Sequence, residues 1–339
     1  ANSASLPFLF KGKKRGSQWY FSLHSTGSGS PLQLYGQTEK VSLHPKVISV
    51  YGKGKGAHGI TRFAMNMSHI HYDSDDMHIN IPNLLIYGNS SIGSAQIPAT
   101  MAFAKVTDAE CNMGSLYAGK IHAKIPFQWP YPAMELDKIK FVNEPERYCT
   151  IGEIKYADMD VGRMSAIPYQ DGLNIIFSGQ HTDFLPDFLV NFSGMAGISD
   201  EGSFVSKVDF KASESGNAIK IDLGKFSPQL ADTFFEGNLD INGNCSSIGN
   251  TITSSGLVAM HNATIEAPEK KMILEGLDLD LSIPDLYKFR SDPEQVLKFK
   301  RFAWGDIEMN EGEVEFQIES LSSLFLKKSS FSWCEGHVY

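Results

Sequence analysis

Several familiar signatures are missing from this sequence. No apolar run approaches the roughly 20 residues that a membrane-spanning helix needs. The four cysteines, Cys111, Cys149, Cys245 and Cys334, form no CxxC pair, which argues against a zinc ribbon or a thioredoxin-type site. They could form disulfides in an oxidising compartment, but their spacing leaves the pairing open. The GxSxG and HExxH motifs of common hydrolases and zinc proteases are also absent.

Acidic residues are scarce in one part of the chain. Residues 1–65 contain nine Lys or Arg and a single acid, Glu39, for a net charge of +8. Because the whole chain carries −9, the remaining residues carry −17. This asymmetry suggests either an end that approaches an anionic surface such as phospholipid, or a solvated charge cluster on a turn. It disfavours nucleic acid, which the acidic body would repel.

The first residues, ANSASLPFLFKGKKRG, do not follow the order of a signal peptide. Their charges come after the short apolar stretch instead of before it. The abrupt start suggests a fragment, whose membrane anchor would lie outside this chain.

What the sequence does contain is alternation of apolar and polar residues with period two. This pattern is typical of antiparallel strands with one dry and one wet face. Glycine, of which there are 30, and Asn, Ser and Asp separate these runs at intervals of about 8–12 residues, which is the all-β spacing. The clearest runs are IHAKIPF at 121–127, AIKIDL at 218–223, LDLDLSI at 277–283 and EVEFQIE at 313–319.

Few helices and turns are predicted. Asp292, Pro293 and Gln295 resemble the capped start of a short helix through about Phe299, and two further candidates begin at Ser227 and within 182–192. NGN at 242–244 and EGE at 311–313 are predicted as hairpin turns.

The apolar face of these strands must be covered, and the sequence contains no long amphipathic helix that could do so. Two arrangements remain. Either a second sheet closes over the first, or one sheet curls into a trough that exposes an apolar strip. We expect an all-β, mostly antiparallel, curved sheet over residues 1–339, with possible sub-parts at 1–180 and 181–339. Candidate groove-lining residues are Ile219, Ile221, Leu223, Leu277, Leu279, Leu281, Val314, Phe316 and Ile318, for each of which closed-sandwich core is the alternative.

The stretch HIHYDSDDMH at 69–78 is the strongest candidate for metal chemistry. On a strand, His69, His71 and Asp73 share one face and could hold zinc or copper. The same alternation assigns these positions to water, so the wet face of a hairpin is the favoured interpretation. We therefore predict no metal and no cofactor.

Two other motifs fail on context. GSLYAGKI at 114–121 nearly matches a phosphate-binding loop, but Ile121 replaces the hydroxyl residue and a strand follows instead of a helix. Asp278 and Asp280 alternate with leucine and lack the glycine and distal glutamate of a calcium loop. Paired carboxylates for glycoside chemistry stay open, since sequence gives no distances.

From Glu236 onward the order of elements resembles the YdbH-like family, relatives of AsmA and TamB in the Gram-negative envelope. The matching features are the strand at Ile273–Leu277, the helix cap before Val296, the strand entry Gly305-Asp306-Ile307 and the closing strand at Phe331–Gly336. They cover about 100 residues, and none is catalytic. Cys334-Glu335-Gly336 stands where the family pattern has paired glycines.

This resemblance implies a β-trough with an apolar interior, tethered to the inner membrane and reaching across the periplasm. It also implies movement of phospholipid to the outer membrane, with acyl chains and envelope proteins as partners. We therefore expect a non-catalytic lipid-conducting protein. The rival is an adhesin-like or carbohydrate-binding β-sandwich, or a glycan-active enzyme on that scaffold.

Overall fold

The computed structural model describes residues 6–27, 30–35, 40–75, 77–93, 99–130, 140–142, 144–156, 159–171, 174–183, 188–199, 203–214, 219–225, 230–249, 251–286, 288–320, 323–334 and 336–338. Strands account for 83% of these described residues and helices for 3%. The sheet is antiparallel, curved and unclosed, which confirms the predicted fold class. The chain divides into two units, Ala1–Gly179 and Gln180–Tyr339, with β12 (Asn174–Thr182) across the division.

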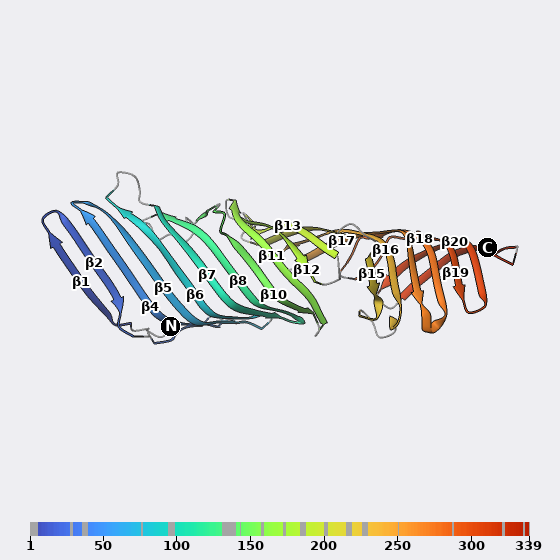
Figure 1. Ribbon diagram of the computed structural model, residues 1–339, viewed down its shortest axis with the longest axis horizontal. Coiled ribbons are helices and arrows are strands. Elements are labelled where there is room, and N and C mark those ends of the chain that lie inside the picture. Colours follow the sequence, from blue (N-terminus) through green and yellow to red (C-terminus); the bar gives the residue numbers. More distant parts are fainter. Residues whose placement is uncertain are drawn as a thin grey trace. The chain divides into compact units, whose positions relative to one another are not determined.

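Unit 1 is a meander of long strands, which lie side by side in chain order (Figure 1). Each main strand pairs with the next by an antiparallel ladder. The short strands β3 and β9 pair with the free ends of β4 and β8. The strands are β1 (Phe8–Arg15), β2 (Gln18–Ser25), β3 (Leu32–Tyr35), β4 (Lys40–Lys55), β5 (His58–Asp73), β6 (Met77–Ile92), β7 (Ala99–Met113), β8 (Leu116–Pro130), β9 (Lys140–Phe141), β10 (Tyr148–Tyr156) and β11 (Met159–Asp171).

Unit 2 repeats this plan with its own meander. The ladder runs from β13 to β14, then to β16 and through each later strand to β22, while β15 pairs with the free end of β16. The strands are β13 (Phe188–Ile198), β14 (Phe204–Glu214), β15 (Ile219–Asp222), β16 (Phe234–Ile248), β17 (Thr251–Ala267), β18 (Met272–Ile283), β19 (Gln295–Trp304), β20 (Ile307–Ser320), β21 (Ser323–Trp333) and β22 (Gly336–Val338).

Bulges bend the strands of unit 1. His69 in β5, Asp108 in β7 and Lys120 in β8 have φ of 51°, 54° and 51°, in the left-handed region. The pairing register shifts at each of them, in the β4–β5 ladder at His69 and in the β7–β8 ladder at Asp108 and Lys120. Because a bulge bends its strand and increases its twist, this row of bulges folds the sheet along a crease.

A second row of bulges lies in unit 2. Asn262 in β17, Gly276 in β18 and Glu311 in β20 have φ of 47°, 62° and 51°. The backbone N–H of Asn262 donates to Asp278 Oδ1 at 2.9 Å, so a neighbouring strand satisfies the donor that the bulge takes from the ladder. The crease is therefore built by both backbone geometry and side-chain hydrogen bonds.

The fully buried core lies mainly in unit 2. Its cluster contains Phe188, Ala212, Ile221, Phe235, Ala263, Leu277, Leu279, Leu281, Ile283 and Phe316. In the described part of unit 1, the buried hydrophobic residues are three alanines, Ala102, Ala109 and Ala123, together with Ile154. The two units thus have similar strands but very different coverage of their apolar faces.

The helix predicted from Asp292 to Phe299 is wrong, because β19 starts at Gln295. The polar groups expected to cap a helix make non-local bonds instead. Gln295 Oε1 accepts from the Ser282 N–H at 2.8 Å, and Ser282 Oγ donates to Asp292 at 2.5 Å. The helix expected within 182–192 is contradicted by β13, which starts at Phe188.

The described helices are the 3₁₀ turns Leu223–Lys225 and Pro268–Lys270. The candidate helix start at Ser227 lies outside the described residues. None of the described helices has the length and apolar character that a membrane crossing requires.

Both predicted hairpin turns are also wrong. Asn242–Asn244 lies inside β16, and Glu311–Glu313 lies inside β20. Glu311 is the left-handed residue of a bulge, so the glycine beside it marks a bend within one strand. Glycine beside a polar residue is favoured both at bulges and at turns. The sequence pattern therefore could not distinguish the two, which explains the wrong turn predictions.

Candidate functional site

The inner face of unit 1, defined by the rows below, is a continuous apolar surface. In one row, Met65 of β5 pairs with Ile86 of β6, then Ala104 of β7 and Ile125 of β8. Neighbouring rows on the same face are Leu23, Val50, Phe63, Gly88, Ala102 and Phe127, and Met67, Leu84, Val106, Ala123, Cys149 and Ala166. None of these positions carries a charge.

The larger side chains of this inner face are only half-buried. This holds for Met65, Ile86, Ile125 and Phe127, in contrast to the small alanines beside them. At about 25 cal/mol per Å² of apolar surface, leaving several hundred Å² uncovered forgoes on the order of 10 kcal/mol. A strip of this kind is typical of a surface that binds something apolar.

Aromatic rings cover the glycines at the β2 end of this face. Trp19 lies over Gly54 and Gly59, and Phe21 lies over Gly52, at distances where a Cβ atom would collide with the rings. The rings of Trp19 and Phe21 stack with centroids 5.9 Å apart. The glycines therefore let the aromatic side chains lie flat and continue the apolar surface toward the edge strand.

Two free cysteines, Cys111 and Cys149, also occupy this face. Cys111 pairs with Ile79 and Ala118, and Cys149 with Ala123 and Ala166. Burial raises the pKa of both thiols, which is expected for apolar surroundings and disfavours a reactive nucleophile.

The opposite, outer face of the same strands carries charged pairs beside apolar side chains such as the stacked rings of Tyr87 and Phe103. Lys124 forms an ion pair with Glu146, and Glu153 binds Lys155 on its own strand and Lys120 on the neighbouring strand. The hydrogen bond that Lys155 donates lowers the pKa of Glu153, and the hydrogen bond that Lys124 donates to Glu146 raises the pKa of Lys124. These exposed pairs keep the outer face solvated and add little stability.

The groove-lining residues predicted from sequence all belong to unit 2. Leu277, Leu279, Leu281, Ile221 and Phe316 share its inner face, where Leu277 is 1% and Phe316 8% exposed. The remaining predicted residues are Leu223 and Ile318, partly buried against the same core, the half-buried Val314, and Ile219, which begins β15. The buried members pack against this protein core and offer almost no surface to a ligand in this structure.

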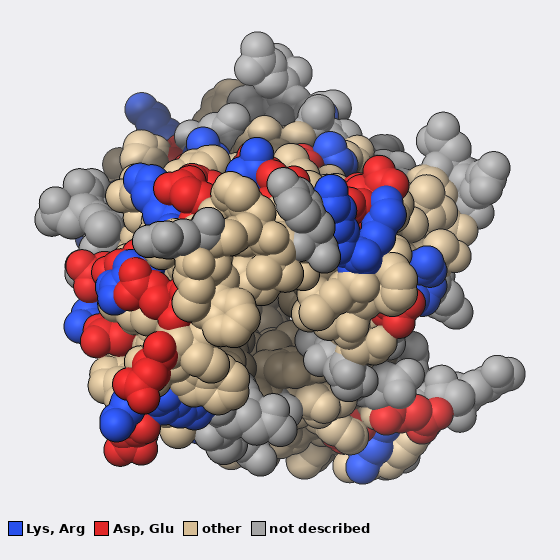
Figure 2. All heavy atoms as spheres, turned by 90° about the vertical axis from the view of Figure 1, so that its right-hand side faces the viewer, with Lys and Arg blue, Asp and Glu red and all other residues tan. Residues whose placement is uncertain are grey.

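Figure 2 views the molecule from the end at which β19 and β20 lie. Uncharged side chains border a recess near the centre of this view, and Lys, Arg, Asp and Glu gather toward its periphery. The burial of Leu277, Leu279 and Leu281 shows that alternation identified the dry face of β18.

The run IHAKIPF at 121–127 correctly placed Ala123, Ile125 and Phe127 on one face of β8, but the predicted groove-lining residues include none from unit 1. On the neighbouring strands, bulges shift the alternation. In β5, the inner positions run Met65, Met67, Ile70 and Tyr72, and the step at His69 breaks the period. A pattern search that permits one inserted residue at a polar position would find this face.

The histidine-rich stretch forms the end of the β5–β6 hairpin. Asp73 binds His78 Nδ1 at 3.0 Å, and His69 Nδ1 contacts Ser68 Oγ at 3.0 Å. The left-handed bulge at His69 removes the simple spacing that would place it beside His71. Within the described ranges, no three His, Cys, Asp or Glu side chains gather in a way that could hold a metal.

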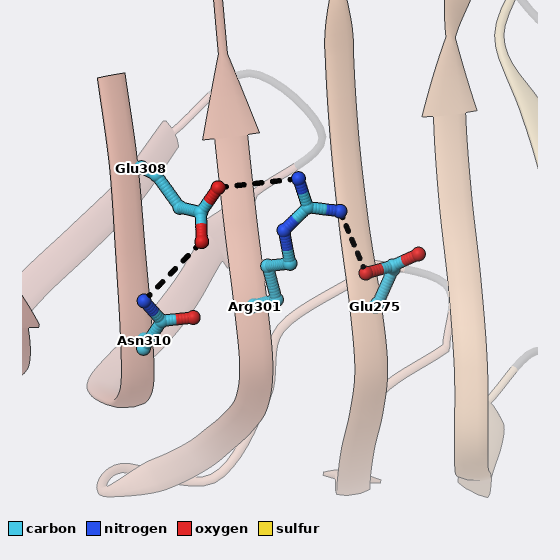
Figure 3. A network of polar contacts seen from close by, with 4 residues as sticks. All are labelled: Glu275, Arg301, Glu308 and Asn310. Carbon is cyan, nitrogen blue, oxygen red and sulfur yellow. Dashed lines mark hydrogen bonds and ion pairs between the residues drawn. The ribbon is translucent and has the colours of Figure 1, made fainter. Parts of the chain in front are cut away.

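A polar network crosses β18, β19 and β20 on the outer face of unit 2 (Figure 3). Arg301 binds Glu275 at 3.1 Å and Glu308 at 3.2 Å, and Glu308 also accepts from Asn310 at 3.5 Å. The Arg301 guanidinium lowers the pKa of Glu308. All members lie on neighbouring strands, so we interpret the network as a structural link between these strands rather than as a catalytic acid–base pair.

A scan of protein-family models found no match to the chain. Searches among curated proteins and among solved structures found none either. The likeness to the YdbH-like family therefore stays an interpretation of the sequence.

Proposed function

We propose that this chain is a non-catalytic lipid-conducting protein, which holds phospholipid acyl chains against the inner face of unit 1. The observation that supports it is the row structure of that face. Its cross-strand rows are free of charge, and their larger members, such as Ile86 and Ile125, are only half-buried. Each methylene group buried there gains about 0.8 kcal/mol.

The uniformity of the face favours conduction over storage. Neighbouring rows offer similar Met, Ile, Leu and Ala side chains, so an acyl chain that moves by one strand exchanges one apolar contact for another. No charged side chain in these rows would anchor a headgroup. Movement of phospholipid needs only a continuous apolar path, with no nucleophile or cofactor.

The location is part of the proposal and depends on the family resemblance. We propose a periplasmic protein, tethered to the inner membrane outside this chain, which passes phospholipid between the inner and outer membranes. Envelope proteins near the membrane would be its partners. The physical reason is that acyl chains moving between two bilayers must be shielded from water, which an open apolar trough would do.

The experiment is extraction of the purified full chain with organic solvent, followed by mass spectrometry of the lipids. We expect copurified phospholipid, and a reduction of about tenfold or more in Ile86→Glu, because a carboxylate would have to be buried beside the acyl chains. Leu85→Glu is the matched control. Its neighbours are Asn66 and Lys105 on the outer face, so its lipid content should be unchanged.

Absence of lipid from the wild-type protein, or equal loss in both variants, would contradict the proposal. Binding to a glycan array by lipid-free protein would favour the carbohydrate-binding alternative instead.

A further inference from the structure

The outer face of the first strands carries a cluster of cations. We call it the basic patch, and it comprises Lys11, Lys13, Arg15, Lys53, Lys55 and Arg62. All six side chains are exposed. In the register, Lys13 pairs with Tyr20 and Tyr20 with Lys53, while Arg15 pairs with Gln18 and Gln18 with Lys55. Cations separated along the sequence are thus gathered on one face of β1, β4 and β5, with Tyr20 and Gln18 of β2 between those of β1 and β4.

The alternation places this patch on the face opposite to the apolar rows. Trp19 and Phe21 lie over Gly54 and Gly52 on the inner face. Tyr20 and Lys53 lie between these positions in sequence and therefore point outward. The patch is consequently separate from the proposed lipid path.

No carboxylate neutralises the patch within the described part of the chain. Glu39 is the one acid among residues 1–65, and the ion pairs of unit 1 involve lysines and histidines elsewhere. Like charges gathered on one face repel one another, so the cluster costs stability unless it meets an anion.

Apolar groups are interleaved with the cations. Tyr20, Tyr51 and Ile60 are 47%, 61% and 50% exposed on the same face. Tyr20 and Ile60, with Lys53, Lys55 and His58, line an open concavity of about 550 Å³. Lysine beside exposed tyrosine and isoleucine suits the headgroup region of a bilayer, where phosphates and acyl carbons lie within a few ångströms of each other.

We propose that the basic patch docks unit 1 on the surface of a bilayer that contains anionic phospholipid. A small soluble anion would need converging, buried donors, whereas these cations are exposed and spread over β1, β4 and β5. The exposed apolar groups between the cations favour a bilayer over a nucleic-acid duplex, because acyl carbons lie beside the phosphates only in the bilayer. This role goes beyond lipid conduction, since it uses the outer face and would hold even if the inner face bound nothing.

The test is cosedimentation of the full chain with phosphatidylcholine vesicles, with or without phosphatidylglycerol. We expect binding only to the anionic vesicles, and its loss as salt rises from about 0.1 M to 1 M and the Debye length shrinks from about 10 Å to 3 Å. Lys53→Gln/Lys55→Gln should weaken binding roughly 20- to 30-fold, at about 1 kcal/mol per cation near the surface. Lys11→Gln/Lys13→Gln on β1 should do the same, which guards against a folding defect in either variant.

The matched control is Lys211→Gln/Lys328→Gln, which removes two exposed cations from unit 2 and should leave binding unchanged. Equal binding to neutral vesicles, or equal loss in the control, would overturn the proposal. Tighter binding to polyglutamate or to a DNA duplex than to anionic vesicles would overturn it too, in favour of a protein or nucleic-acid partner. Ile86→Glu should not change sedimentation, so this test and the extraction test fail independently.

Discussion

Leu85 and Ile86 are neighbours in β6 but belong to opposite faces of the sheet. Ile86 pairs with Met65 and Ala104 on the apolar inner face, whereas Leu85 pairs with Asn66 and Lys105. One peptide unit thus separates the proposed lipid path from the outer surface. This contrast lets a single strand supply both a variant and its control.

Substitutions at His69 distinguish a structural bulge from a metal site. Because its φ is 51°, His69→Gly should keep stability within about 0.5 kcal/mol, whereas His69→Val should cost about 1–2 kcal/mol. Thermal unfolding of both variants is the measurement. A metal site would behave differently: zinc would raise the melting temperature of the wild type, and His69→Gly would abolish that rise.

Leu277 and Met65 should respond differently to truncation. Leu277→Ala opens a cavity in the covered core of unit 2 and should cost about 2–5 kcal/mol. Met65→Ala removes a half-buried side chain and should cost less than half as much. Hydrogen exchange of the amides in β18 and β5 reports each unit separately. Equal costs would show that both inner faces are covered to the same degree.

The cysteines provide a chemical probe of the inner face. Cys334 is exposed, whereas burial raises the pKa of Cys149 and lowers its thiolate fraction at neutral pH. Maleimide labelling followed by mass spectrometry should therefore modify Cys334 first. Removal of bound lipid should speed labelling of Cys149 and leave Cys334 unaffected. A labelling rate of Cys149 that does not depend on lipid would argue against acyl chains at the row that contains Cys149.

The Arg301 network predicts a titration shift. Its hydrogen bond lowers the pKa of Glu308 below the ordinary value of 4.5, so the bond's small contribution to stability is present above that pH. It is lost as the pH falls through the lowered value. In Arg301→Gln, the pKa of Glu308 measured by NMR should rise toward 4.5, and acid unfolding should begin at slightly higher pH. An unchanged pKa would mean that the ion pair does not form in solution.

The sequence predicted the strands better than their boundaries. Leu277–Ile283 alternates without interruption and lies in β18, because one face meets a core and the other meets water. The helix predicted from Asp292 was wrong because its capping groups bind Ser282 across the sheet, a contact that a local sequence pattern cannot reveal. The hairpin turn predicted at Glu311 was wrong because turns and bulges favour the same residues.

The candidate surface could be predicted only in part. Alternation of apolar and polar residues predicts that Leu279 and Met65 lie on the apolar faces of their strands. It does not predict which parts of the protein cover either side chain. Coverage depends on how far each unit curls, which the bulges set. Those bulges also shifted the phase in β5 and hid the more exposed surface from a strict search for alternation.

The most direct measurement is photocrosslinking from single sites in β6 in living cells. A benzophenone amino acid at position 86 should form adducts with phospholipid, detectable by mass spectrometry, whereas the same group at position 85 should form few or none. Equal adducts at both positions, or adducts at position 85 alone, would contradict an inner face that carries acyl chains.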